Sequence, residues 1–186
     1  MPNNYFQFKQ FTVQHDRCAM KVTTDGCLFG AWVAKEVQPF TGLQVHLLDI
    51  GAGTGLLSLM VAQKNNLAIE AIEIDPAAAR QAAENVAASP WKETISITNQ
   101  DVLHWRTTRQ YDCIFSNPPF YENELKSGKG TKNIAHHDEG LKLAGLFQFI
   151  KTHLKSEGCF FLLLPAKREK EAAALLQSHG LCLQRK

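Results

Sequence analysis

The stretch Asp49-Ile50-Gly51-Ala52-Gly53-Thr54-Gly55 follows the apolar residues 45–48 and precedes a second apolar run at 56–61. Three glycines at alternate positions let the backbone turn tightly and let a ligand approach main-chain atoms closely. A buried strand that enters such a loop and continues as a helix is typical of nucleotide-binding α/β folds. The stretch therefore predicts a strand, a glycine loop and a helix, with a ligand site at the carboxyl end of the strand.

The spacing of these glycines argues against a dinucleotide ligand. The dinucleotide pattern G-x-G-x-x-G seats a pyrophosphate on the helix N-terminus, whereas here Gly55 comes one residue early. The leading Asp49 would also repel phosphate. A ligand with cationic groups suits this acid better, and S-adenosylmethionine (SAM) carries both a sulfonium and an ammonium group. We therefore expect Asp49 to lie near the ammonium group of SAM.

Two further acids are expected at the ends of the next strands. Glu73 stands about 20 residues beyond the glycine loop, the distance at which such folds place an acid on ribose hydroxyls. Asp75-Pro76 has the form of a helix start, with Asp75 as N-cap, so Glu73 should end a strand. Asp101 follows the expected strand at 95–98. Its carboxylate could accept a hydrogen bond from the adenine amino group of the cofactor. Simple alternatives are a solvated loop carboxylate for Glu73 and an acidic turn for Asp101.

Asn117-Pro118-Pro119-Phe120 follows the apolar run 111–115. An amino group conjugated to a ring or carbonyl is a poor nucleophile unless acceptors hold its hydrogens. Asn117 can offer its side-chain oxygen, and the two prolines favour a turn whose carbonyls point outward. Phe120 adds a flat face for a base. The tetrapeptide indicates methylation of such an amine through positioning and preorganised electrostatics, with a plain Pro-Pro turn as the alternative.

Taken together, these motifs resemble the class I SAM-dependent methyltransferases that carry N-P-P-[FY]. The stretches 8–11 (FKQF), 16–26 (DRCAMKVTTDG) and 89–91 (SPW) are similar to those of the bacterial tRNA1(Val) adenine N6-methyltransferases. The likeness runs from about residue 6 to residue 165, which is most of the chain. Thr23 departs from the pattern, because glycine is expected there.

The resemblance implies one methyltransferase domain over 1–186, in which residues 1–40 cover the cofactor and residues 41–186 form a Rossmann-like core. It also implies that residues 117–120 hold the target adenine, just 3′ of the anticodon in a tRNA anticodon loop. The residues expected to contact SAM are Lys21, Thr24, Asp25, Asp49, Gly51, Gly53, Gly55, Glu73, Ile74, Asp101 and Val102.

Two kinds of alternative function remain open. The same chemistry serves other acceptors, namely a protein glutamine amide, guanine N2 in rRNA and adenine N6 in DNA. The block 16–26 and the lack of room for a separate helical recognition domain favour tRNA among these. A function of a different class is a catalytically silent RNA-binding module that keeps the fold.

The overall charge offers little attraction for nucleic acid. The formal net charge is only +2, so binding must depend on local patches. The best candidate patch is the glycine-containing loop 126–132, where Lys126, Lys129 and Lys132 could contact RNA phosphates. A solvated loop with no partner is an equal alternative.

Cysteine and hydropathy patterns predict a soluble cytoplasmic protein without a metal. The five cysteines are odd in number and form no C-x-x-C pair, which argues against a disulfide framework and a zinc ribbon. His136-His137-Asp138 are adjacent residues that do not converge on one ion. The longest apolar run, 159–164, is far shorter than the about 20 residues that a membrane helix needs.

The order of elements predicts an α/β fold with a doubly wound, mostly parallel sheet. After a short N-terminal hairpin or loop, strands are expected near 46–50, 69–74, 95–98, 111–116 and 159–164, with helices near 56–64, 76–88, 141–154 and 167–178.

The family resemblance implies a sheet of seven strands. Residues 181–186 resemble the beginning of the sixth, so the C-terminal hairpin is expected to be incomplete. The strand at 160–164 would then be an unpaired edge through which the protein could self-associate.

Overall fold

The computed structural model describes residues 3–40, 45–118 and 143–184. The elements in chain order are β1 (Tyr5–Gln7), β2 (Thr12–Gln14), α1 (Thr24–Glu36), β3 (His46–Ile50), α2 (Leu56–Ala62), β4 (Ala68–Glu73), α3 (Pro76–Ala87), β5 (Ile95–Asn99), β6 (Tyr111–Ser116), α4 (Leu143–His153), β7 (Leu154–Leu162), the 3-10 helix η1 (Ala166–Arg168) and α5 (Glu169–Ser178).

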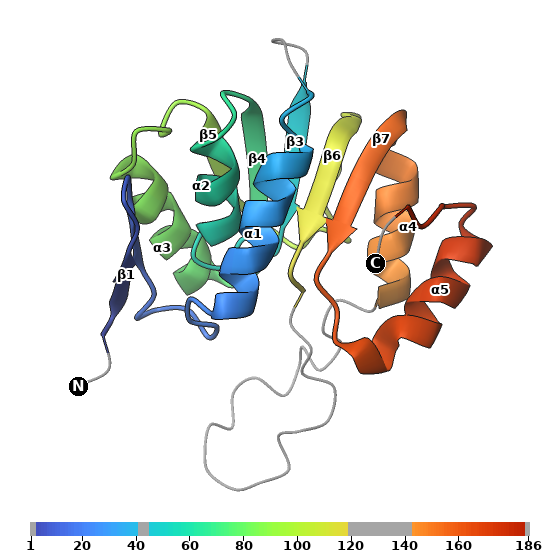
Figure 1. Cartoon of the computed structure of the whole chain (residues 1–186), viewed down its shortest axis with the longest axis horizontal. Coiled ribbons are helices and arrows are strands. Elements are labelled where there is room, and N and C mark those ends of the chain that lie inside the picture. The colour runs from blue at the N-terminus through green and yellow to red at the C-terminus, as the bar shows by residue number, and fades with distance from the viewer. Residues whose placement is uncertain (1–2, 41–44, 119–142, 185–186) are drawn as a thin grey trace, which may run out of the picture.

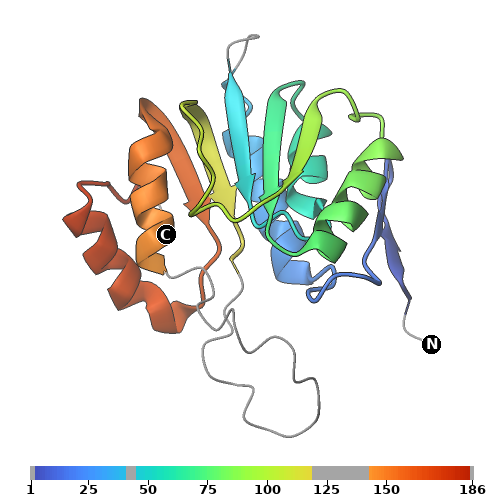
Figure 2. The same cartoon turned by 180° about the vertical axis from the view of Figure 1, so that it is seen from behind.

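Five of the strands form one sheet in the order β5-β4-β3-β6-β7, and every neighbouring pair is parallel. The helices cover both faces of this sheet, as the two opposite views show (Figures 1 and 2). The predicted α/β class with a doubly wound sheet is therefore confirmed. Because all five strands run the same way, their carboxyl ends meet at one edge, which is the lower edge in Figure 1.

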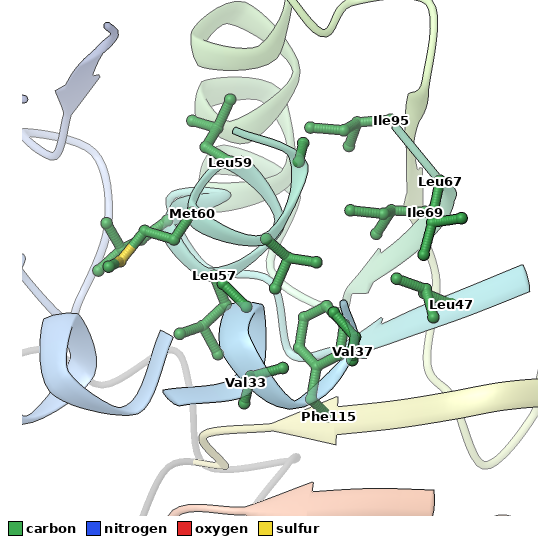
Figure 3. Close-up of a cluster of buried hydrophobic side chains, with 14 of the residues drawn as sticks. Val33, Val37, Leu47, Leu57, Leu59, Met60, Leu67, Ile69, Ile95 and Phe115 are labelled. Atoms are coloured by element: carbon green, nitrogen blue, oxygen red, sulfur yellow. The ribbon is translucent and has the colours of Figure 1, made fainter. Parts of the chain in front are cut away.

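Alternate strand residues build two hydrophobic cores, one on each face of the sheet. Leu47 and Phe115 pack in a cluster with α1 and α2, whereas their neighbours Leu48 and Ile114 pack in a cluster with α4 and α5. Figure 3 shows the first cluster. Residues that follow one another on a strand point to opposite faces, so strands covered on both sides are largely apolar.

The helix α1 is an element that the sequence did not predict, because only a hairpin or loop was expected in the first 40 residues. Thr23 is its N-cap, and its side chain accepts a hydrogen bond from the Gly26 amide. Gly30 lets α1 approach α2, since a Cβ there would lie 2.7 Å from Met60 Sδ. Glycines weaken a helix in isolation, and here tertiary packing compensates for them.

The C-terminal part differs from expectation in two details. The strand expected at 159–164 begins earlier, because β7 starts at Leu154 directly after the end of α4. Residues 181–184 have no regular secondary structure, so the beginning of a sixth strand is not observed there. The described strands of the sheet number five, with β5 and β7 at its edges.

Within the three described ranges, no helix has the length and apolar character of a membrane span. The same residues contain no group of three or more His, Cys, Asp and Glu side chains placed to hold a metal ion. The triplet His136-His137-Asp138 lies outside the described residues.

Candidate cofactor and catalytic site

The glycine loop after β3 has the geometry of a ligand cradle. Gly51, Gly53 and Gly55 have φ values of +74°, +55° and +80°, a left-handed conformation that favours glycine. The loop is held to β4, because the amides of Gly51 and Ala52 both donate to the Ile72 carbonyl. A Cβ built on Gly51 or Gly53 would meet no heavy atom within 4 Å. The loop is therefore open on the side where a ligand would approach.

Glu73, the last residue of β4, connects this loop to the next one. Its Oε2 accepts a hydrogen bond from the Gly53 amide at 2.7 Å, and its Oε1 accepts one from the Asp75 amide at 2.9 Å. Glu73 is buried, so the alternative of a solvated loop carboxylate is wrong. Each carboxylate oxygen has a second lone pair. Glu73 can thus hold the loop and still accept hydrogen bonds from ribose hydroxyls.

Asp49 is fully buried at the carboxyl end of β3. Its Oδ2 accepts a hydrogen bond from Ser58 Oγ at 2.7 Å, but its Oδ1 has no hydrogen-bond partner among the described residues. The pKa of Asp49 is raised to about 7, mainly by burial and in smaller part by the charge of Glu73, while the hydrogen bond from Ser58 opposes the rise. A buried acceptor without a partner is costly. The Oδ1 atom of Asp49 is therefore available to accept a hydrogen bond from a cationic group of a ligand.

We expect the Asp49→Asn variant to gain stability relative to the parent as pH rises from about 4 to about 7. Above its unfolded pKa of 3.8, Asp49 has lost its proton in the unfolded chain, whereas the folded protein keeps it until about pH 7. The parent is therefore progressively destabilised across this interval, and the penalty is constant above it. The shift corresponds to on the order of 4 kcal/mol in the free energy of unfolding.

Urea unfolding of the parent and the variant at several pH values measures this difference. The exposed Glu93 provides a control, because Glu93→Gln should leave the pH profile of the parent unchanged. A difference between Asp49→Asn and parent that does not vary with pH would mean that folding does not raise the pKa of Asp49 above its value in the unfolded chain.

The remaining acids at this edge have local roles. Asp75 is the N-cap of α3, where its Oδ1 accepts hydrogen bonds from the Ala77 and Ala78 amides. Asp101 forms an acidic turn, with Oδ1 accepting from the Leu103 amide and Oδ2 paired with His104 Nδ1. These bonds support the turn interpretation of Asp101 and leave its contact with adenine a prediction.

The apolar residues expected at the cofactor differ in their exposure. Ile74 is 59% exposed next to Glu73, so its side chain is available to a ligand at the strand ends. Val102 is instead buried in the core cluster on the α4 and α5 side.

Asn117 follows β6 directly and is half-buried. Its position is fixed by the pairing of β6 with β3, in which Ser116 lies opposite Ile50 and donates from Oγ to the Ile50 carbonyl at 2.6 Å. Asn117, the first residue of the Asn-Pro-Pro-Phe tetrapeptide, thus lies beside the strand that leads into the glycine loop. Pro118 is buried. The expected residues outside the described part of the chain are Pro119, Phe120, Lys126, Lys129 and Lys132.

Two buried polar residues of α3 that the sequence analysis missed attach the N-terminal segment to this site. Asn85 Oδ1 accepts from the Gln14 amide, and Asn85 Nδ2 donates to the carbonyls of Gln14 and Thr54, all at 2.9 Å. Gln81 Oε1 accepts from the Arg17 amide at 3.1 Å. A signal was present, since two amides four residues apart interrupt an alanine-rich helix.

The segment that follows β2 passes close to the acids of the site. Burial raises the pKa of Cys18 to about 11, and the charges of Glu73 and Asp75 add to the shift, so the thiol lies near both carboxylates. The side chains of Lys21, Thr24 and Asp25 are exposed. Their contact with a cofactor remains a prediction.

The chain is similar in sequence to known methyltransferases. A family model described as "Methyltransferase small domain" matches residues 35–178. The chain is 45% identical over 183 residues to a tRNA1(Val) (adenine(37)-N6)-methyltransferase of Phocaeicola vulgatus, covering 98% of this chain and 76% of that protein. It is 46% identical over 188 residues to the protein of the same name from Dyadobacter fermentans, covering 100% of this chain and 76% of that protein.

Solved structures show the same fold at lower identity. The chain is similar to precorrin-6y C5,15-methyltransferase from Geobacter metallireducens, with a TM-score of 0.56 and 17% identity over 81% of this chain and 70% of that chain. It is also similar to a SAM-dependent methyltransferase from Thiobacillus denitrificans in complex with S-adenosyl-L-homocysteine, with a TM-score of 0.53 and 14% identity over 85% of this chain and 57% of that chain.

Fold and sequence therefore define a Rossmann-like, SAM-dependent methyltransferase. The chain belongs to the methyltransferase small domain family and, within it, to the tRNA1(Val) (adenine(37)-N6)-methyltransferases. It spans about three quarters of the length of these relatives.

The residues present fit the cofactor of this class. Gly51 and Gly53 leave open space beside the loop, and Asp49 Oδ1 is a buried acceptor without a partner among the described residues. Glu73 adds a buried carboxylate at the end of the adjacent strand. When bound, SAM supplies an electrophilic methyl group on its sulfonium.

Proposed function

We propose that this protein methylates the exocyclic N6 of an adenine in tRNA, with adenine 37 of tRNA1(Val) as the substrate. The observation that carries the proposal is the placement of Asn117 beside the glycine loop. The pairing of Ser116 with Ile50 makes this placement a consequence of the sheet register. The names of relatives at 45% and 46% identity support the choice of tRNA.

In this proposal the turn after β6 acts on the amine without a general base. Asn117 Oδ1 and the Pro118 carbonyl accept the two N6 hydrogens, which favours a pyramidal nitrogen with a free lone pair. Phe120 stacks on the adenine after it has left the anticodon-loop stack. Pro119 fixes the turn between them. The chain thereby supplies orientation and acceptors for an amine that is otherwise a weak nucleophile.

The proposal assigns the remaining parts of the chain to one domain over residues 1–186. Residues 1–40 cover the cofactor, and residues 41–186 form the core. The hydrogen bonds of Asn85 to Gln14 and Thr54 support this arrangement, because they connect the N-terminal segment to the glycine loop. Lys126, Lys129 and Lys132 contact phosphates of the anticodon loop, and a tRNA substrate places the enzyme in the cytoplasm.

Methylation of a defined tRNA tests this function. The purified protein is incubated with SAM carrying a deuterated methyl group and a tRNA1(Val) transcript, and the digested nucleosides are analysed by mass spectrometry. Labelled N6-methyladenosine is expected from this transcript and not from a matched transcript with guanine at the target position. Binding of SAM without labelling of either transcript would favour a silent RNA-binding module, and labelled guanosine would indicate a different acceptor.

We also propose that the protein self-associates through β7. Among the described strands β7 pairs only with β6, which leaves backbone groups on its other side able to pair with another strand. A cavity of about 530 Å³ lies beside this strand and is lined in part by Trp32, Phe40 and Phe161. Sedimentation over a range of protein concentrations is expected to show reversible association. A single monomeric species at all concentrations would contradict it.

A further inference from the structure

Met20 of the N-terminal segment contacts the residue that is proposed to hold the substrate amine. Asn117 Nδ2 donates a hydrogen bond to Met20 Sδ at 3.6 Å, although the two residues are 97 positions apart in the sequence. Both side chains are half-buried. A thioether sulfur has no hydrogen to donate and can only accept, weakly. The contact therefore selects the nitrogen end of the Asn117 amide and directs Oδ1 away from Met20.

The orientation of this amide decides whether Asn117 can act. An amide presents a donor at one end and an acceptor at the other, and a rotation of about 180° exchanges them. The N–H groups of a substrate amine donate hydrogen bonds, so they can bind only to the oxygen of the Asn117 amide. If Asn117 were reversed, its NH2 group would face another donor, and its oxygen would face the lone pairs of the Met20 sulfur. Met20 thus penalises the orientation that cannot bind an amine.

Met20 is itself held in place by the segment around it. The Val22 amide donates to His15 Nδ1 at 3.4 Å, which closes the chain around Met20. On the other side of Met20, the Arg17 amide donates to Gln81 of α3. His15 and Gln81 are both buried. The sulfur is therefore presented to Asn117 by a segment that is anchored before and after it.

We propose that Met20 is a positioning residue that sets the side-chain amide of Asn117 with its oxygen toward the substrate amine. The role of Met20 is to act through Asn117, without contact of its own with the reacting atoms. This inference rests on the proposed function for the meaning of the orientation, but the orientation itself can be measured without methyl transfer.

Met20→Leu removes the acceptor and keeps an apolar side chain of similar size. Turnover is expected to fall about 3- to 10-fold, the range that one modest hydrogen bond contributes, while SAM affinity changes less than about twofold. Met20→Gln restores an acceptor and should recover most of the turnover. Met60→Leu is the matched control, because Met60 is buried in α2 against Gly30 and should affect stability without changing turnover.

A double-mutant cycle separates positioning from packing. In the Asn117→Ala background, Met20→Leu should cause no further loss of turnover, because the amide that it orients is gone. An additional loss of the same size in that background would overturn the proposal. The proposal would also be overturned if a loss of SAM affinity explained the whole loss of turnover in Met20→Leu, because Met20 would then act on the cofactor pocket.

An NMR measurement is independent of activity. The side-chain NH2 resonances of Asn117, identified by their disappearance in Asn117→Ala, should shift in Met20→Leu and return toward the parent in Met20→Gln. These shifts are expected even if the protein transfers no methyl group to tRNA, so failure of the proposed function leaves this test intact. Unchanged Asn117 resonances in Met20→Leu would overturn the inference.

Discussion

Replacing Asn117 with alanine is expected to lower methyl transfer by roughly 100-fold or more, the scale observed when a preorganised polar contact to a transition state is deleted. The affinity for SAM should stay within a few-fold of the parent, because the glycine loop, Asp49 and Glu73 are untouched. The effect should appear in the maximal rate, since the amine hydrogens lose their acceptor as the nitrogen changes geometry.

Single-turnover methylation and calorimetry with SAM measure the two quantities separately. Asn65→Ala is a suitable control, because Asn65 is also half-buried but binds the Ala34 and Val61 carbonyls away from the strand ends. It should keep both the rate and the affinity. If Asn117→Ala lost SAM affinity as much as it lost rate, Asn117 would belong to the cofactor pocket.

Replacing Glu73 with alanine is expected to weaken SAM binding by roughly tenfold to over a hundredfold. A charge-assisted hydrogen bond of this kind contributes about 1.5–3 kcal/mol. The structure adds a second reason, because the carboxylate also accepts from the Gly53 and Asp75 amides. Glu73→Gln should weaken binding as well, since its NH2 group would have to face one of these two N–H donors.

Calorimetric titration with SAM compares these variants with the parent. Glu93→Ala removes an exposed carboxylate and should bind as the parent does. Circular dichroism of each variant checks that the fold is retained. If both Glu73 variants bound SAM with parental affinity, the cofactor site would have to lie away from the end of β4.

The sequence patterns that succeeded were local ones. The glycine loop, the N-cap at Asp75 and the apolar strand cores are each defined by residues close together in the chain, and the structure places them where they were expected. Helix α1 was missed because its glycines disfavour a helix unless a neighbour packs against them. Asp101 was expected at the cofactor because it follows a strand. In the structure its carboxylate instead accepts a hydrogen bond from the Leu103 amide within the same turn.

The sequence by itself indicated the class of the protein, because its loop glycines, strand-end acids and Asn-Pro-Pro-Phe tetrapeptide are local patterns that resemble those of SAM-dependent methyltransferases. Only the tertiary structure decided how these parts meet. It buried Asp49 and raised its pKa, connected Asn85 to a strand 71 positions away, and placed Met20 against Asn117 across 97 positions. Such contacts depend on sheet order and packing between distant segments, which local periodicity in a single sequence does not encode.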